Sequence, residues 1–260
     1  VGSWTAEALA RTGVGCITLV DLDDVCISNC NRQVHALEHT VGRSKCAVMK
    51  ERILHINPEC DVRLVQDFLT EETCEGILSR GYDFVVDAVD FAPHKAHIIN
   101  FCFHNQVPIV CTGGTGGVEN PFLIRVDDLT EVKYNPLAAA TRKTLRQTMG
   151  FPPGTTTTSR KEKHLQNSRW NVPMVYIPVN RNVPAAPAPR TFPVPRRLPP
   201  IDPEESKSSG VETALPDRRL GCAGGSGSAV SVTGCVGFFV AAYVVDQLVA
   251  WGTEELNESK

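Results

Sequence analysis

Charged and amide side chains crowd directly after a short apolar run near the start of the chain. Residues 17–20 are apolar and indicate a buried strand, and residues 21–45 then bring acidic, amide and basic side chains in close succession. In an open α/β sheet, ligands bind beyond the carboxyl ends of the strands. We therefore interpret residues 21–45 as a segment that grips ATP.

Two carboxylates follow predicted strands. Asp21 ends the second strand of a βαβ pattern, about 20 residues after a glycine turn, where such folds hydrogen-bond a ribose hydroxyl. Asp90 follows the apolar residues 82–89, and a carboxylate there can hold Mg²⁺ that bridges phosphate oxygens. The alternative for both is structural, since Asp21 can cap a helix or serve a loop and Asp90 can cap the next helix.

Lys45 lies near the start of a helix predicted over residues 41–58, which Pro58 ends. The N-terminal end of a helix is already partly positive, so a cation there is unfavourable unless an anion binds beside it. A phosphate group close to Lys45 is therefore expected.

The elements that must position these residues alternate between helix and strand. Apolar spacing predicts helices and strands in turn over residues 5–12, 16–21, 41–58, 61–65, 70–79, 82–89, 91–106 and 107–111. This alternation predicts an α/β fold, a Rossmann-like doubly wound and mostly parallel sheet. Gly2 fits the last glycine of a dinucleotide-binding turn, although a flexible helix start explains it equally well.

Composition argues against two classes of protein, those attracted to nucleic acid by overall positive charge and those built on a zinc ribbon. The chain has 260 residues, 42% of them hydrophobic, and a formal net charge of −3, so no overall positive charge draws it to nucleic acid. None of its ten cysteines forms a C-x-x-C pair, which makes a zinc ribbon unlikely to be its scaffold. Most thiols are expected in the core of a protein from a reducing compartment.

Several separated motifs carry a family resemblance. The segments VDLDDVCISNCNRQ, VGRSK and DAVD resemble the adenylating domain of the ubiquitin-activating-enzyme-like superfamily. Within it, LARTGVGCITLVDLDDV, NRQVHAL, INPEC, CTGGTGG and NPLAA most closely resemble the tRNA threonylcarbamoyladenosine dehydratases, which are related to the molybdopterin and thiamine sulfur-carrier adenylyltransferases. The resemblance covers residues 1–146 and resumes at LGCAGGSGSAV.

The resemblance implies ATP-dependent activation of a carboxylate as an acyl-adenylate, followed by cyclisation and net dehydration of threonylcarbamoyladenosine beside the tRNA anticodon. It implies a nucleotide-binding set made of Gly2, Asp21, Asn29, Arg32, Gln33 and Lys45. Asp21 would hold the ribose, Asn29 and Arg32 would contact the phosphates, and Lys45 would neutralise the triphosphate. Arg32, Lys45 and Asp90 would be catalytic, with Asp90 also the Mg²⁺ ligand. A guanidinium, an ammonium and a metal stabilise the charge that develops on phosphate oxygens.

The chain departs from this pattern in two places. Only the tail of the family's nucleotide loop is present, as Val1, Gly2 and Ser3, so we expect a fold truncated at its N-terminal strand and leave its activity open. Some members carry a cysteine where Met174 stands, and no thioester role is assigned to Met174.

We predict three segments. Residues 1–150 form the ATP-binding adenylating domain, residues 151–219 a crossover region with a disordered proline-rich loop, and residues 220–260 a C-terminal apolar helix on the same domain. The crossover region could offer tRNA a basic surface, from Arg160, Lys161, Lys163, Arg169, Arg190, Arg196 and Arg197, although such a stretch is more often a spacer.

The C-terminal helix approaches the length of a membrane span. Asp246 and Gln247 interrupt it and small residues lower its hydrophobicity, so we favour a helix buried in the core or in a homodimer interface, without stable membrane insertion. Cys222, in the glycine-rich turn before it, is expected to be a buried small residue rather than a nucleophile.

Three functions remain open. The first is the tRNA-modifying enzyme, with ATP and Mg²⁺ as cofactors and the tRNA anticodon arm as partner. The second is an activator of a sulfur-carrier or ubiquitin-like protein, and the third is a nucleotide-binding module without catalysis. A sulfur-transfer partner protein is conceivable for the first two. We expect an intracellular protein, cytoplasmic in a bacterium or associated with mitochondria in a eukaryote.

Overall fold

The computed structural model describes residues 1–152, 169–179 and 227–258, with side chains up to residue 253. All these residues belong to one compact unit. Its elements are, in chain order, α1 (Gly2–Arg11), β1 (Cys16–Val20), η1 (Ile27–Asn29), η2 (Glu38–Thr40), α2 (Lys45–Ile56), β2 (Asp61–Val65), α3 (Glu71–Leu78), β3 (Val85–Asp87), α4 (Ala92–His104), β4 (Ile109–Thr112), η3 (Pro121–Leu123), β5 (Arg125–Asp128), α5 (Pro136–Thr148), β6 (Pro173–Tyr176) and α6 (Val230–Glu258).

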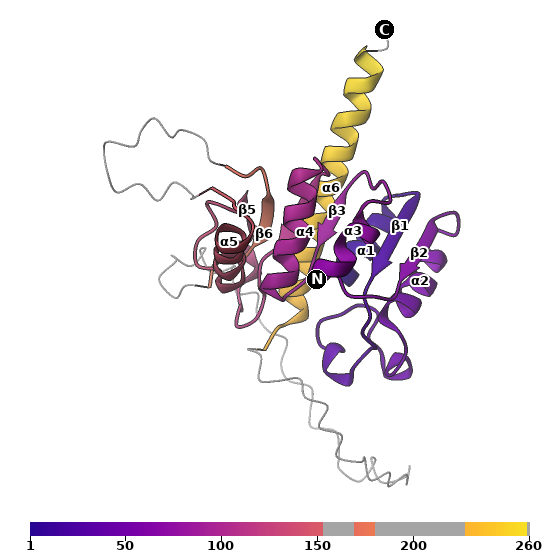
Figure 1. Cartoon of the computed structure of the whole chain (residues 1–260). Coiled ribbons are helices and arrows are strands. Elements are labelled where there is room, and N and C mark those ends of the chain that lie inside the picture. Colours follow the sequence, from indigo (N-terminus) through magenta and orange to yellow (C-terminus); the bar gives the residue numbers. More distant parts are fainter. Residues whose placement is uncertain (153–168, 180–226, 259–260) are drawn as a thin grey trace, which may run out of the picture. The chain divides into compact units, whose positions relative to one another are not determined.

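Parallel strands flanked by helices build this unit (Figure 1). β1 and β2 pair in parallel over their whole length, with Cys16 opposite Asp61 and Val20 opposite Val65. A second sheet has the order β3-β4-β6-β5, in which only β5 runs antiparallel. The predicted α/β class with a mostly parallel sheet is confirmed, although within the described ranges no strand pairing joins β1 to β3.

Helices α1 and α6 pack closely because glycine removes the side chain at their contact. A Cβ at Gly237 would lie 2.6 Å from the Cβ of Trp4, a distance that real Cβ atoms do not reach. The Trp4 ring meets Phe238 edge-on, with ring centroids 5.7 Å apart. The first and last helices of the described chain are thereby packed against each other.

Two groups of buried side chains form the core. The first fills the space around α1, α2, β1, β2 and α6 and includes Ile17, Ile53, Val62, Val232, Val236 and Val240. The second lies between α4, α5 and the larger sheet and includes Ile98, Ile99, Leu129, Leu145, Trp170 and Met174. Met174 lies on β6 and is fully buried there.

Two predicted boundaries are wrong, and two elements were not predicted. The strand over residues 82–89 is β3, which ends at Asp87, because the carboxylate of Asp87 accepts a hydrogen bond from the N–H of Val89 and turns the chain. The helix over residues 41–58 begins only at Lys45, because the hydroxyl of Ser44 caps it. Neither β5 nor α5 was predicted, although Asn135 followed by Pro136 is a helix start signal.

The predicted apolar C-terminal helix is α6. By length and composition, its residues Val230–Thr253 could cross a membrane, and 44% of the most apolar window is buried inside the protein. Val232, Val236 and Val240 on one face of α6 are buried in the first group of core side chains. Phe238, Phe239 and Val249 of the same helix are exposed. The predicted boundaries at residues 150 and 219 lie beside or within ranges that are not described, as does the proline-rich segment.

Candidate active site

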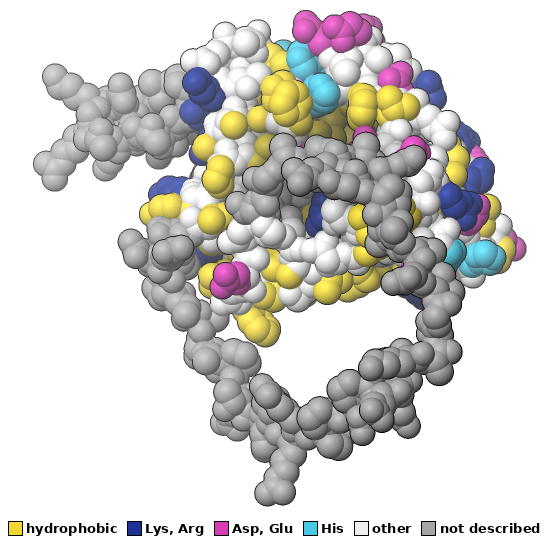
Figure 2. All heavy atoms as spheres, turned by 90° about the horizontal axis from the view of Figure 1, so that it is seen from below, with side chains coloured by type: hydrophobic (Ala, Val, Ile, Leu, Met, Phe, Trp, Pro, Cys, Tyr) yellow, Lys and Arg dark blue, Asp and Glu magenta, His cyan; other side chains and the backbone are white. Residues whose placement is uncertain are grey.

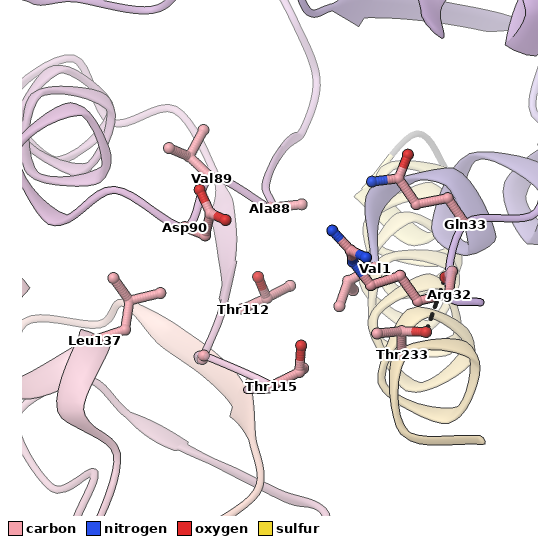
Figure 3. Close-up of a pocket in the computed structure, with 12 residues that line it drawn as sticks. Val1, Arg32, Gln33, Ala88, Val89, Asp90, Thr112, Thr115, Leu137 and Thr233 are labelled. Atoms are coloured by element: carbon pink, nitrogen blue, oxygen red, sulfur yellow. Dashed lines mark hydrogen bonds between the residues drawn. The ribbon is translucent and has the colours of Figure 1, made fainter. Parts of the chain in front are cut away.

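A cavity of about 150 Å³ lies where the segments after β1, β3 and β4 come together (Figure 3). Its lining consists of Val1, Arg32, Gln33, Ala88, Val89, Asp90, Thr112, Gly113, Gly114, Thr115, Leu137 and Thr233. Figure 3 shows Arg32, Gln33 and Thr233 on one side and Val89 and Asp90 on the other. The cavity thus occupies the carboxyl-terminal edge of the strands, where α/β folds bind ligands.

Asp90 is exposed in the loop after β3. Within the described part of the chain, its carboxylate forms no hydrogen bond and no ion pair. It stands three residues beyond Asp87, the last residue of β3, rather than at the strand end where the sequence placed it. Both of its oxygens are therefore available to a cation at the cavity.

A buried ion pair holds the loop that carries Asp90. The ammonium of Lys95 on α4 lies 2.8 Å from Oδ2 of Asp87 and donates a second bond of 3.3 Å to the carbonyl of Asp87. Both side chains are inaccessible to solvent. Removing one partner of such a pair leaves an uncompensated buried charge, which is strongly destabilising. Sequence reasoning missed Lys95.

Arg32 lies in the loop after β1, and its backbone is fixed from two helices. Its carbonyl oxygen accepts hydrogen bonds from the indole of Trp4 (3.0 Å) and from the hydroxyl of Thr233 (2.9 Å). Its guanidinium donates to the carbonyl of Ser28 and to the amide oxygen of Asn31. Both acceptors are neutral, so the positive charge at the cavity is not compensated by them.

Gln33 and Asn29 differ in their relation to the cavity. Gln33 lines it, and the buried Oε1 atom of Gln33 has no hydrogen-bond partner in the described structure. Asn29 is buried at the end of η1, where its side-chain oxygen accepts from the N–H of Cys26. Asn29 is outside the cavity lining and holds the shape of the loop.

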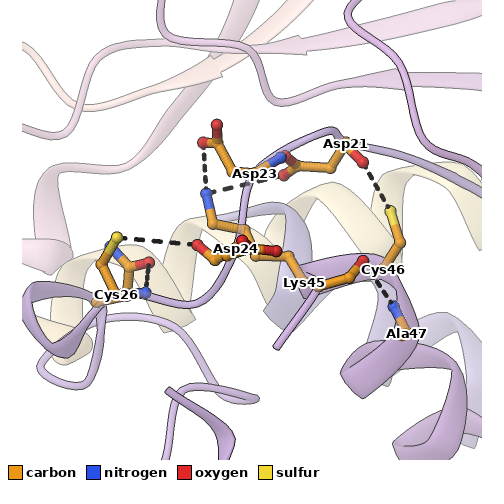
Figure 4. A network of polar contacts seen from close by, with 9 residues as sticks. Asp21, Asp23, Asp24, Cys26, Lys45, Cys46 and Ala47 are labelled. Atoms are coloured by element: carbon orange, nitrogen blue, oxygen red, sulfur yellow. Dashed lines mark hydrogen bonds and ion pairs between the residues drawn. The ribbon is translucent and has the colours of Figure 1, made fainter. Parts of the chain in front are cut away.

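Asp21, Asp23 and Lys45 form a second charged group, which we call the Asp21 cluster (Figure 4). The ammonium of Lys45 lies 2.7 Å from a carboxylate oxygen of Asp23 and 4.0 Å from one of Asp21. The other oxygen of Asp21 accepts from the N–H of Asp23. Burial raises the pKa of Asp21, and the charges of Asp23 and Asp90 add to that effect, against the backbone hydrogen bond and Lys45.

The cavity floor requires a glycine. A Cβ at Gly113 would lie 2.6 Å from the Cβ of Tyr176 and 2.7 Å from the side-chain nitrogen of Asn135. The amide of Asn135 accepts from the N–H of Gly114 and donates to the carbonyl of Gly114. The glycine-rich segment after β4 is therefore shaped by close packing, and Thr112 and Thr115 are thereby placed at the cavity.

Gly2 opens α1 beside the loop after β3. A Cβ on Gly2 would lie 3.2 Å from the Cβ of Ala88, tighter than most real contacts. The amino-terminal turn of α1 can approach Ala88 closely because this residue is glycine. That placement is compatible with a phosphate near the start of α1.

His35 is a buried residue near these charges. It is 5% exposed, and neither ring nitrogen has a hydrogen-bond partner in the described structure. Burial lowers the pKa of His35 to about 4, and the positive charge of Lys45 contributes. The imidazole is therefore neutral at pH 7.

Within the described residues, no group of three or more His, Cys, Asp and Glu side chains is placed to hold a metal ion. Of the described residues that line the cavity, Asp90 alone has a carboxylate. A single carboxylate fits Mg²⁺ delivered with a triphosphate, because that ion keeps waters and phosphate oxygens as most of its ligands.

Sequence reasoning identified Arg32, Gln33 and Asp90 of the cavity but missed Thr112, Thr115, Leu137 and Thr233. The glycine-rich CTGGTGG segment was noted, and its position after a predicted strand was the available signal for the first two. Nothing in the spacing pointed to Thr233, which is 201 residues from Arg32 in sequence.

Known proteins are similar to this chain along nearly its whole length. The ThiF family matches residues 1–258. The tRNA threonylcarbamoyladenosine dehydratase of Escherichia coli (strain K12) is 38% identical over 250 residues, which are 96% of this chain and 83% of that relative. The enzyme of the same name from Haemophilus influenzae is 35% identical over 249 residues, 96% of this chain and 82% of that relative.

A solved structure supports the same relation. The crystal structure of the Escherichia coli dehydratase in complex with ATP is similar to this chain with a TM-score of 0.72 and 35% sequence identity. The match covers 98% of this chain and 84% of that one.

Proposed function

This chain belongs to the ThiF family, and on that basis we propose that it catalyses the ATP-dependent dehydration and cyclisation of threonylcarbamoyladenosine next to the tRNA anticodon. The observation that supports this most strongly is the cavity between Arg32 and Asp90, in a chain similar to dehydratases over 96% of its length. Uncompensated charges of both signs face a space at the edge of the strands.

The proposed reaction has two steps. A carboxylate oxygen of the threonylcarbamoyl group attacks the α-phosphate of ATP, and pyrophosphate leaves. A nucleophilic atom of the same group then attacks the acyl carbon and gives up its proton, while the bond between that carbon and the AMP oxygen breaks, so that AMP leaves with one of the original carboxylate oxygens. The net change in the tRNA is the loss of one water.

Each charged side chain has a role in the first step. Arg32 binds the α-phosphate oxygens, on which negative charge increases, and Gln33 contacts the same region of the cavity. Asp21 hydrogen-bonds the ribose, and Lys45 compensates the charge of the triphosphate. Asn29 supports the loop that presents Arg32.

Asp90 would hold Mg²⁺ at the cavity, where the ion would neutralise charge on the phosphates. Its free carboxylate is the support for this assignment, and the buried pair of Asp87 and Lys95 fixes the loop that presents it.

The tRNA would contact a basic surface. Arg169 does not contribute a free charge, since it pairs with Glu131 through two bonds of 3.0 Å. On the face in Figure 2, Lys and Arg side chains lie in separate groups mixed with acidic ones. The other basic residues predicted for this surface lie outside the described residues.

We propose that the exposed apolar side chains of α6, among them Phe238 and Phe239, form a homodimer interface and do not insert into a membrane. No feature of the described residues points to a partner protein for sulfur transfer. We place the protein inside the cell, because its proposed substrate is tRNA. Gel filtration with light scattering should give a dimer mass, and a monomer would contradict the dimer.

The decisive experiment incubates this chain with ATP, Mg²⁺ and tRNA that carries threonylcarbamoyladenosine, followed by mass spectrometry of the nucleosides. The proposed function predicts the loss of one water that depends on ATP. An unchanged nucleoside together with pyrophosphate exchange driven by a small carrier protein would instead show a sulfur-carrier adenylyltransferase.

A further inference from the structure

The main chain at Arg32 is held by two side chains that are distant from it in sequence. The carbonyl oxygen of Arg32 accepts one hydrogen bond from Trp4 on α1 and another from Thr233 on α6. Both lone pairs of this carbonyl are thereby used. The orientation of its peptide group, which sets the direction of the neighbouring side chain, depends on both helices.

Of the two hydrogen bonds to the carbonyl of Arg32, the one from Thr233 is the shorter, and the Thr233 hydroxyl has only weaker alternative acceptors. The hydroxyl lies 2.9 Å from the carbonyl of Arg32, 3.3 Å from that of Ala229 and 3.4 Å from that of Val230. A hydroxyl has one proton to donate, and the shortest of these contacts is the bond to Arg32. Thr233 is 2% exposed, so water does not compete for that proton.

The segment just before α6 also joins the two sides of the cavity. The side chain of Asn31, next to Arg32, donates a 2.8 Å bond to the carbonyl of Ser228. The hydroxyl of Ser228 lies 3.2 Å from that of Thr115, on the glycine-rich segment after β4. The loop that presents Arg32 and the cavity floor are therefore tied to the same short segment.

We propose that Thr233 is a positioning residue for Arg32: its hydroxyl fixes the peptide group at Arg32 so that the guanidinium meets the phosphates of ATP. This inference rests on the role of Arg32 in the proposed function. Thr233 acts through the backbone, although it also lines the cavity. Displacement of a reacting group by about 1 Å is enough to cost a large factor in rate.

Thr5 provides a matched control. It is also a threonine, it is also 2% exposed, and it also lies between α1 and α6. Its hydroxyl donates a 3.1 Å bond to the carbonyl of Gly237, away from the Arg32 loop. Thr5→Val and Thr233→Val each remove one buried hydroxyl and keep the branched shape of the side chain, so similar losses of thermal stability are expected.

The experiment measures ATP binding by isothermal titration calorimetry on the full chain and its Thr233→Val, Thr233→Ser and Thr5→Val variants. The Thr233→Val variant should bind ATP about tenfold more weakly, the upper end of what one buried hydrogen bond contributes. Thr233→Ser, which keeps the hydroxyl, should restore affinity to within about twofold of the parent. Thr5→Val should bind like the parent.

The proposal would be overturned if Thr233→Val bound ATP as tightly as the parent, or if Thr5→Val weakened ATP binding as much as Thr233→Val. A parent chain that binds no ATP would also overturn it, since Arg32 would then have no phosphate to meet. If the expected pattern of affinities appears but the tRNA nucleoside loses no water, the positioning role stands and the proposed function fails.

Discussion

The charges of the Asp21 cluster are paired, whereas those of the cavity are not. Lys45 has Asp23 at 2.7 Å and Asp21 at 4.0 Å. Arg32 and Asp90 face the cavity without an ion pair in the described structure, and Arg32 contacts only neutral oxygens. Charged residues beyond the strand ends therefore occupy two kinds of site. In the Asp21 cluster they are paired within the protein, whereas at the cavity Arg32 after β1 and Asp90 after β3 have no ion-pair partner among the described residues and need a ligand that carries both signs of charge.

The largest effect should follow from removing the cavity's positive charge. Arg32→Ala should reduce ATP–pyrophosphate exchange in the presence of substrate tRNA by about a thousandfold, because charge on the α-phosphate then has no fixed counterpart. Stability should change by less than about 0.5 kcal/mol, since the guanidinium contacts are exposed. Undiminished exchange would remove Arg32 from the site.

Arg63→Ala is the matched control for this variant. Arg63 is exposed on β2, where it pairs with Asp61 on the same strand. Its replacement should leave the exchange rate unchanged. A similar loss in both variants would point to net charge rather than to the cavity.

The next effect concerns the cavity's negative charge. Asp90→Asn should lower the exchange rate by about a hundredfold and raise the Mg²⁺ concentration for half-maximal rate, because an amide is a weaker ligand for a hard cation. A magnesium titration of both proteins measures this. Asp83→Asn, which changes an exposed carboxylate just before β3, should behave like the parent, and an unshifted magnesium curve for Asp90→Asn would refute the metal role.

A smaller effect is expected in the paired group. Lys45→Met should raise the KM for ATP by about tenfold, because an ammonium near the triphosphate is lost. Asp23→Asn should change KM by no more than about twofold, since a pair with a carboxylate that is 56% exposed contributes little. Steady-state kinetics on both variants measure the two KM values. Equal increases in Lys45→Met and Asp23→Asn would show that Lys45 acts only through its ion pair and does not bind ATP.

The sequence predicted what depends on local pattern. Apolar periodicity placed Asp21 directly after β1, as the structure has it. The start of α2 was predicted four residues early, because that pattern did not show that Ser44 caps the helix. Asp90 was misplaced relative to its strand because apolar residues continue past Asp87, where a side-chain hydrogen bond turns the backbone. Periodicity contains no information about that bond.

What the sequence did not predict depends on contacts between distant segments. Thr233 touches Arg32 only because α6 packs on α1, and that packing depends on the absence of a side chain at Gly237. The floor of the cavity depends in the same way on Asn135 reaching Gly114. α5 is a different case, because the sequence does contain its start signal: Asn135 caps the helix and Pro136 is its first residue.

The smallest effect is a pH dependence of stability, which arises at His35, a buried residue whose pKa is influenced by Lys45 of the Asp21 cluster. The pKa of His35 is lowered to about 4, first by burial and then by Lys45, from an ordinary value of 6.5. Below pH 6.5 the unfolded chain therefore takes up a proton at His35 that the folded chain does not, and stability falls as the pH falls toward 4. Between pH 7 and pH 6 the loss should be about 0.7 kcal/mol.

Urea unfolding at both pH values measures this loss. His35→Gln, which does not titrate, should flatten the dependence, whereas His39→Gln at an exposed position should not. Lys45→Met should reduce the dependence in part, because one of the charges that keep His35 neutral is removed. An unchanged dependence in Lys45→Met would mean that Asp21 and Asp23 already cancel the charge of Lys45 at His35. The compensation within the Asp21 cluster would then be complete, and its contrast with the cavity would become sharper.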